Sequence, residues 1–163
     1  MCSDGDVPAL DEIVFRPYRR EDLGKIVTLD AACFRTPFRF PRAAMQRFAE
    51  AENAWAEVAV SGDEVLAFCI AHREQIPHET VGYVVTIDVA QQHRRRGLAR
   101  RLIEDAQLWL RHEGATALLL HVYAENDEAV EFYASLGFRR GAEQPGFYGP
   151  GLDALLYWKR LDN

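Results

Sequence analysis

Cysteine is scarce in this chain of 163 residues: the three that it has, Cys2, Cys33 and Cys69, lie far apart. An odd number of cysteines without a Cys-x-x-Cys pair argues against a disulfide framework and against a zinc-binding spacing. The five histidines include no His-x-x-x-His or His-Glu-x-x-His pair, so we expect no metal site. Cys33 and Cys69 lie in apolar stretches, which predicts small buried thiols in a reducing cytoplasm.

Long apolar runs are missing as well, since none reaches the roughly 18 residues that a membrane-spanning helix needs. The first twelve residues, MCSDGDVPALDE, lack the basic start and apolar stretch of a signal peptide. The net charge is −6, so the chain lacks the positive excess of a nucleic-acid or membrane-surface binder. We therefore expect a cytoplasmic protein that binds neither nucleic acid nor membrane, with residues 1–12 as a flexible leader.

The composition that is present is that of one globular domain, which we place at residues 13–163. Hydrophobic residues make up 48% of the chain and charged residues 27%, and a domain of this size can bury a core without crosslinks. Apolar periodicity and turn residues predict strands at 13–19, 54–60, 65–74, 80–90, 115–123, 138–143 and 153–161, and helices at 20–34, 42–52, 97–114 and 126–137. This order indicates a mixed α/β fold with one central β-α-β unit, and open sheets bind ligands where the strands of such a unit end.

Positive charge is concentrated at one junction, HRRRGLARR (residues 93–101), where the predicted strand 80–90 meets the predicted helix 97–114. A helix N-terminus has unpaired N–H groups and a partial positive charge, so it binds anions. Gly97 and the small Ala99 would let a phosphate approach the backbone, and the neighbouring arginines would neutralise its charge. The junction therefore predicts a pyrophosphate site.

Two other interpretations of this charge stay open. Arg101, and in part Arg96, can be solvated surface residues, because the helix that follows has an apolar opposite face. A nucleic-acid arm would give an affinity that depends steeply on salt. The basic run is confined to one junction, however, and has no interleaved aromatic residues for base stacking.

Two motifs resemble those of a known family. Arg94-x-x-Gly97-x-Ala99 between a strand and a helix resembles motif A of the GCN5-related N-acetyltransferases. The segment NDEAVEFYASLGF matches the family pattern N-x-x-A-x-x-x-Y-x-x-x-G-F at Asn126, Ala129, Tyr133, Gly137 and Phe138. The two motifs lie one helix and one strand apart, as in that family. The resemblance implies the family's fold, a mostly antiparallel mixed sheet flanked by helices, with acetyl-CoA at the central β-α-β unit.

The resemblance also implies which residues hold acetyl-CoA. The pantetheine arm would pair with the backbone of Ile87, Asp88 and Val89 and touch Asn126. The pyrophosphate would lie on the junction, formed by Arg94, Arg95, Arg96, Gly97, Leu98, Ala99 and Arg100. The Tyr133 hydroxyl would stand near the thioester sulfur, where a phenol can give a proton to the leaving thiolate; the alternative for Tyr133 is packing in the core.

Within the family, the chain most resembles the protein N-terminal acetyltransferases, the RimI-like and NatE-type enzymes. The segments that carry this resemblance are CFRTPF (33–38), GYVVTIDV (82–89), LLLHVYAEN (118–126) and GFYGPGLDALLYWKRL (146–161). It implies that Tyr83 and His121 are catalytic bases and that the acceptor lies among Phe34, Phe38, Tyr83 and Tyr148. A tyrosine pair of these enzymes is Phe147-Tyr148 here, so one hydroxyl is missing.

His121 is a candidate functional residue even without the resemblance, because it is a lone ionisable group in the apolar run ALLLHVY. It is either a core histidine with one satisfied hydrogen bond or a general base. The reference pKa of an α-amine is near 8 and that of lysine near 10.4, so a histidine near 6.5 suits an α-amine better.

Four functions are open from the sequence. The first is acetylation of a protein N-terminus by direct transfer, with Tyr83 and His121 as bases and Tyr133 as acid, in a monomer or homodimer. The second is acetylation of a small amine such as a polyamine, amino acid or antibiotic, which an acidic open cleft would favour. The third, an acyl-CoA-binding regulatory module without turnover, is disfavoured by Tyr133 and His121, and the fourth is the nucleic-acid arm described above.

Overall fold

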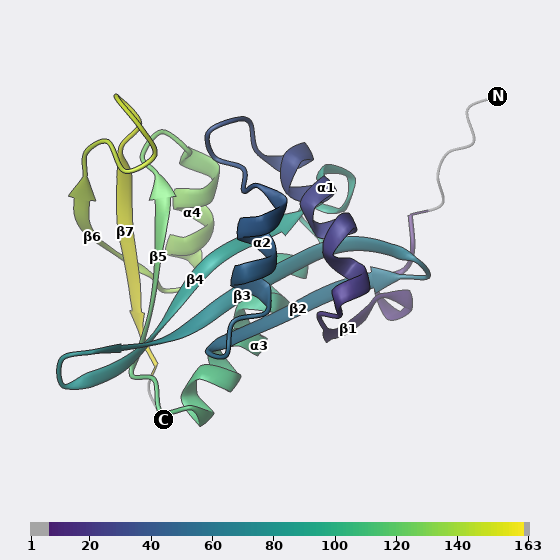
Figure 1. Cartoon of the computed structure of the whole chain (residues 1–163), viewed down its shortest axis with the longest axis horizontal. Helices are drawn as coiled ribbons and strands as arrows, with labels where there is room; N and C mark the ends of the chain where they lie inside the picture. Colours follow the sequence, from purple (N-terminus) through teal and green to yellow (C-terminus); the bar gives the residue numbers. More distant parts are fainter. Residues whose placement is uncertain (1–6, 162–163) are drawn as a thin grey trace.

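The structure is a computed structural model that describes residues 7–161, and these residues form one seven-stranded sheet with helices on both faces (Figure 1). The strands are β1 (Val14–Pro17), β2 (Ala54–Ser61), β3 (Glu64–Ile76), β4 (Glu79–Val89), β5 (Ala117–Tyr123), β6 (Arg139–Gln144) and β7 (Ala154–Arg160). The helices are α1 (Leu23–Cys33), α2 (Arg42–Ala49), α3 (Leu98–His112) and α4 (Asp127–Ser135), with single 3₁₀ turns at η1 (Leu10–Glu12), η2 (Arg20–Asp22) and η3 (Gln91–His93). The predicted strands and helices are present in the predicted order, which confirms the mixed α/β class.

The sheet opens between its two central strands. Its order is β1-β2-β3-β4-β5-β7-β6, and every neighbouring pair is antiparallel except β4 and β5. These two parallel strands pair only where Gly82 faces Leu118 and Tyr83 faces Leu119. Beyond that point they diverge toward their carboxyl ends, as Figure 1 shows, so one edge of β4 is left without a strand partner.

A β-bulge lies on β4 close to this opening. In the ladder with β3, Thr86 faces Ile70 and Val84 faces Ala71, so Val85 has no opposite residue. A bulge bends a strand and increases its twist. Here it accompanies the divergence of β4 from β5, and it separates Tyr83 from the stretch 87–89.

The core consists of two layers on opposite faces of the sheet. The predicted apolar stripe of α3 is buried at every position, and α3 and α4 cover one face. Helices α1 and α2 cover the other face over β2–β4 (Figure 1). Helix α3 lies so close to β4 that a Cβ on Gly82 would collide with Leu110. The stripe consists of Leu98, Leu102, Ile103, Ala106 and Leu110, and full burial of each leucine or isoleucine contributes about 2 kcal/mol.

The two ends of the chain and the cysteines complete the description. Residues 1–6 of the expected leader, with Cys2, lie outside the described residues; residues 10–12 form η1. Cys69 is fully buried as predicted, but Cys33 is only partly buried, because the end of α1 borders two cavities. None of the helices between residues 7 and 161 is both long and apolar enough to cross a membrane.

Candidate active site

A cavity of about 520 Å³ opens where β4 and β5 diverge, and we call it the cofactor cavity. Its walls are the end of β4, the loop from β4 to α3, the first turn of α3, helix α4 and the end of α1. The fold thus brings the two sequence motifs, which are one helix and one strand apart, to the same place. The residues predicted to hold the cofactor that line the cavity are Ile87, Asp88, Val89, Arg94, Arg95, Gly97, Leu98, Ala99, Arg100, Asn126 and Tyr133.

The junction before α3 has the backbone geometry of an anion site. Arg95 and Gly97 both have a positive φ, 62° and 84°, and this turn leads the chain directly into α3. Gly97 is the N-cap residue and supplies no side-chain acceptor to the first N–H groups of the helix. Those groups are therefore free for a phosphate, and the side chains of Arg94 and Arg100 border the same cavity.

Two arginines of the cluster have other partners. Arg96 does not line the cavity: its Nη1 lies 3.3 Å from His93 Nδ1, and its Nη2 donates to the carbonyl of Pro8. The structure thus places Arg96 outside the cavity, because the turn at Arg95 directs the next side chain toward the N-terminal segment. Arg101 forms an ion pair with Asp105 at 3.0 Å on the outer surface of α3, as its solvated interpretation predicts.

Tyr133 packs in the core and also borders the cofactor cavity. It is 8% exposed and packs edge-on against Phe132 and Phe138, and it also borders the cofactor cavity. Burial raises the pKa of Tyr133 well above its usual range, so the hydroxyl keeps its proton at neutral pH. Asn126, which borders the same cavity, is the N-cap of α4, where its Oδ1 accepts the N–H of Ala129 at 3.2 Å.

Tyr83 and His121 meet across the parallel pair of strands. Tyr83 of β4 is opposite Leu119, and His121 lies two residues further along β5, on the same face of the sheet. The Tyr83 hydroxyl is 2.6 Å from His121 Nδ1. The second ring nitrogen, Nε2, is buried and has no hydrogen-bond partner among residues 7–161. The two residues that the resemblance linked to catalysis therefore form one unit.

Burial sets the protonation of this pair. Burial lowers the pKa of His121, while the nearby Gln144 side chain acts in the opposite direction. Burial also raises the pKa of Tyr83 to about 12. At neutral pH the imidazole is then uncharged and the phenol protonated, so His121 is the group of the pair that can accept a proton.

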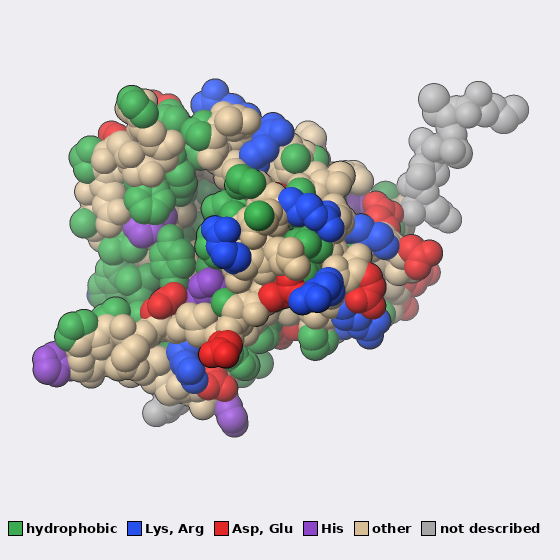
Figure 2. All heavy atoms as spheres, in the orientation of Figure 1, with side chains coloured by type: hydrophobic (Ala, Val, Ile, Leu, Met, Phe, Trp, Pro, Cys, Tyr) green, Lys and Arg blue, Asp and Glu red, His purple; other side chains and the backbone are tan. Residues whose placement is uncertain are grey.

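Aromatic rings from two distant loops surround this pair. Phe147 stacks on His121 with ring centroids 4.2 Å apart, and Phe38 contacts both Tyr123 and Tyr148 at 4.9 and 5.0 Å. Loop 34–41 thus meets loop 145–153 beside β5. We call this region, formed by Phe38, Tyr83, His121, Tyr123, Phe147 and Tyr148, the acceptor cleft. Figure 2 shows a hollow lined with hydrophobic side chains on this face, between the part that contains β5–β7 and the part that carries α2.

The sequence predicted part of this cleft. Phe38, Tyr83 and Tyr148 lie in this region, so their predicted contact with the acceptor stays a prediction, whereas Phe34 borders the cofactor cavity instead. Tyr123 was missed, although its spacing of two from His121 puts both side chains on one face of a strand. Phe147 was noted only as a lost hydroxyl, and its stacking on His121 requires the loop geometry.

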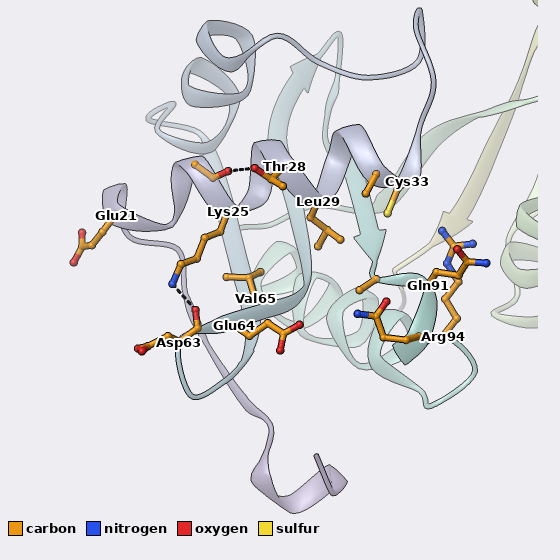
Figure 3. Close-up of a pocket in the computed structure, with 14 residues that line it drawn as sticks. Glu21, Lys25, Thr28, Leu29, Cys33, Asp63, Glu64, Val65, Gln91 and Arg94 are labelled. Carbon is orange, nitrogen blue, oxygen red and sulfur yellow. Dashed lines mark hydrogen bonds between the residues drawn. The ribbon is translucent and has the colours of Figure 1, made fainter. Parts of the chain in front are cut away.

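A second cavity, of about 780 Å³, lies on the other side of α1. Figure 3 shows it between α1, the β2–β3 turn and the β4–α3 loop. Its charged lining groups have both signs, and Lys25 is already bonded to the carbonyl of Asp63. None of the predicted catalytic residues borders it, and it shares only Cys33 and Arg94 with the cofactor cavity. We therefore assign the chemistry to the smaller cavity and the acceptor cleft.

Comparisons with known proteins identify the family. Residues 17–138 match the acetyltransferase (GNAT) family. The 5-NmdU N-acetyltransferase of Pseudomonas phage PaMx11 is 37% identical over 107 residues, which are 65% of this chain and 71% of the relative. N-alpha-acetyltransferase 30 of Schizosaccharomyces pombe is 27% identical over 109 residues, 64% of this chain and 73% of the relative. The solved structure of Arabidopsis thaliana NAA60 in complex with acetyl-CoA superposes with a TM-score of 0.81 at 24% identity, covering 93% of this chain and 99% of that one.

Proposed function

The chain belongs to the acetyltransferase (GNAT) family and is an acetyl-CoA-dependent N-acetyltransferase, and on that premise we propose that its acceptor is the α-amino group of a protein or peptide N-terminus. The observation that carries the proposal is the Tyr83–His121 pair. The Tyr83 hydroxyl lies 2.6 Å from His121 Nδ1, and the Phe147 ring stacks on the imidazole. A neutral histidine is matched to an α-amine, whose pKa is near 8, better than to lysine near 10.4. The similarity to an N-alpha-acetyltransferase supports the same acceptor.

The cofactor cavity fits acetyl-CoA, which supplies the acetyl group as an activated thioester when bound. The uncapped first turn of α3, with Arg94 and Arg100, suits the pyrophosphate. The edge of β4 at Ile87–Val89 has no strand partner and offers backbone groups to the amides of the pantetheine arm. The carbonyl of Val89 already accepts Arg94 Nε at 3.2 Å and Cys33 Sγ at 3.4 Å.

The residues of the acceptor cleft handle the proton of the amine. With the imidazole proton on Nδ1, donated to the Tyr83 oxygen, the unpaired His121 Nε2 is the atom of the pair that accepts the ammonium proton. Because Nε2 is buried, this requires that the entering acceptor displace the side chains that cover it. Tyr83 then holds the tautomer and is a positioning group. As the amine bonds to the acetyl carbon and the carbon–sulfur bond breaks, the Tyr133 hydroxyl gives its proton to the departing sulfur. The second proton of the nitrogen, lost as the amide forms, returns through water to the Tyr133 oxygen, and His121 releases the first to solvent, so both residues regain their starting protonation.

A panel of acceptors tests the proposal. Thiol release from acetyl-CoA would be measured with peptides that have a free N-terminus, with N-terminally blocked lysine peptides and with small amines. We expect turnover of free N-termini that depends on the first residues of the peptide. Turnover of blocked lysine peptides alone would contradict the proposal.

A small-amine acceptor is the second candidate. The observation that favours it is the identity of 37% to the phage 5-NmdU N-acetyltransferase, which exceeds the 27% to N-alpha-acetyltransferase 30. The aromatic walls of the cleft favour the peptide. Two carboxyl groups beside these walls would favour a polyamine instead: Glu125, which accepts the Tyr123 hydroxyl at 2.5 Å, and Asp153 of loop 145–153. Turnover restricted to small amines in the same panel would establish this alternative.

The two free thiols of the described chain suit the reducing cytoplasm that we propose as the location.

A further inference from the structure

Two carboxylic acids are buried next to each other beside the cofactor cavity. Asp30 of α1 is 0% exposed and Asp88 of β4 is 2% exposed. Among the ion pairs of residues 7–161, none involves either carboxyl group. Burying two carboxylates together without a cation would be very unfavourable, so this pair requires another explanation.

The hydrogen bonds show where a proton is needed. Asp30 Oδ2 accepts the N–H of Phe40, and Asp88 Oδ1 accepts the hydroxyl of Thr86, both at 2.8 Å. The two remaining oxygens, Asp30 Oδ1 and Asp88 Oδ2, are buried and have no donor. Helix α1 packs on the end of β4 at this place, since Cys33 Sγ donates to the carbonyl of Val89 at 3.4 Å, and the Asp30 carboxyl is a neighbour that raises the pKa of Asp88. One proton between the two remaining oxygens satisfies both of them, and like-charged carboxyls that share a site retain one.

The surroundings favour this shared proton. Burial and the hydrogen bond to Asp30 raise the pKa of Asp88 well above its usual range. Arg94, from the loop between β4 and α3, is the positive group that opposes this rise. The other titratable groups that face the pair are Cys33 of α1, Cys69 of β3 and Tyr133 of α4, and burial raises the pKa of each, so all three are neutral at pH 7.

Asp30 also closes the loop that borders both sites. Its backbone carbonyl accepts the N–H of Phe34 at 2.9 Å, while its carboxyl accepts the N–H of Phe40. Both ends of loop 34–41 are thus held by one residue, and this loop contains Phe34 of the cofactor cavity and Phe38 of the acceptor cleft. Asp88, the other member of the pair, lies in the stretch of β4 that borders the cofactor cavity.

We propose that Asp30 and Asp88 are positioning residues that share a single proton, and that this proton fixes loop 34–41 against the end of β4 so that the two substrate sites are aligned. The predicted effect on acceptor binding rests on the proposed function. The shared proton and its effect on acetyl-CoA binding are independent of that function, because they concern only the cofactor cavity.

Infrared spectroscopy tests the proton directly. At pH 7 the wild-type protein is expected to show the carbonyl band of a protonated carboxylic acid that disappears in D30N and in D88N. Glu57 provides the matched control, because it is a second carboxyl with a raised pKa, about 8, that contacts Asp105 of α3 on the other face of the sheet. E57Q should remove a separate part of the band. A band that D30N and D88N leave unchanged would overturn the proposal.

Kinetics and binding test the positioning role. Asparagine at position 30 can donate to Asp88 and still accept the N–H of Phe40, so D30N should keep the dissociation constant of acetyl-CoA and both KM values within about threefold of wild type. D30A removes the bond to Asp88 and the bond to the N–H of Phe40, so loop 34–41 is no longer held in place. A displacement of this loop by about 1 Å should raise the dissociation constant and both KM values roughly tenfold or more, with a smaller change in kcat. E57Q should leave all of them unchanged.

The pH profile separates this role from a purely structural one. Above the pH at which the pair loses its shared proton, the affinity of the wild type for acetyl-CoA should fall, while that of D30N should stay constant. Equal impairment of D30N and D30A, or KM values within about twofold of wild type in folded D30A, would refute the positioning role. Where D30A does not fold, the pH series of D30N and wild type decides. If no peptide is turned over, the proposed acceptor fails, while the infrared and acetyl-CoA binding results still judge the pair.

Discussion

The cofactor cavity and the acceptor cleft are built in different ways. The cavity is formed mainly by two short segments, 87–100 and 126–133, in which backbone groups and adjacent side chains face one ligand. The cleft is formed by side chains from four segments that are far apart: loop 34–41, β4, β5 and loop 145–153. A local motif therefore specifies the cavity, whereas the cleft exists only once the whole sheet has formed. We expect variants in the two regions to affect different kinetic constants.

The largest expected effect is that of His121→Ala. Loss of the proposed general base should lower kcat for a peptide acceptor by roughly 10² to 10⁴, while the dissociation constant of acetyl-CoA stays near the wild-type value. Steady-state kinetics and calorimetric titration measure the two quantities. The exposed His112 at the end of α3 gives the matched control, His112→Ala, which should leave both unchanged. A parallel loss of acetyl-CoA binding in His121→Ala would show that the two regions are not separate.

The reciprocal change is Arg100→Ala in the cofactor cavity. Removal of one charge-assisted contact to phosphate should weaken acetyl-CoA binding about tenfold or more and leave the acceptor specificity unaltered. Arg101→Ala is the control, because Arg101 is paired with Asp105 outside the cavity. Equal weakening by the two variants would mean that general positive charge, and not the cavity, binds the cofactor.

A smaller effect is expected at Phe147. Its ring stacks on His121 and is 46% exposed, so Phe147→Ala should raise the KM for a peptide by several-fold through lost aromatic contact, about 1 kcal/mol. The dissociation constant of acetyl-CoA should not change. A fall in kcat at unchanged KM would instead indicate that the ring controls the protonation of His121.

The smallest effect is a displacement of the pH profile. Because burial lowers the pKa of His121 below its ordinary 6.5, the imidazole stays neutral somewhat below that pH. The kcat of the wild type should then fall only as the pH drops through this lowered pKa, and acetyl-CoA affinity should stay level over the same range. A midpoint above 6.5 would contradict the burial of the pair.

Much of the fold could be predicted because local patterns agree with the tertiary structure. The stripe of α3 and the cap at Asn126 are visible in the sequence, since both depend on spacing within a few residues. The bulge at Val85 and the early divergence of β4 from β5 could not be predicted, because they depend on the pairing of strands that are distant in the sequence.

In the candidate site, too, the residues of a local motif could be predicted, whereas those that depend on distant contacts could not. The pattern of motif A placed Arg94, Gly97 and Arg100 at the cavity, where backbone geometry decides the outcome. It did not exclude Arg96, because the direction of that side chain depends on the left-handed backbone of Arg95 and on a contact with Pro8. The buried acid pair was not visible at all, since only the packing of α1 on β4 brings its members together.

A single peptide that contains both a free α-amine and a lysine side chain distinguishes the two kinds of acceptor most sharply. After incubation with the enzyme and acetyl-CoA, fragmentation mass spectrometry locates the acetyl group. We predict that it lies on the α-amine, because the neutral His121 of the acceptor cleft is matched to that group. An acetyl group on the lysine side chain would contradict the proposed α-amine acceptor.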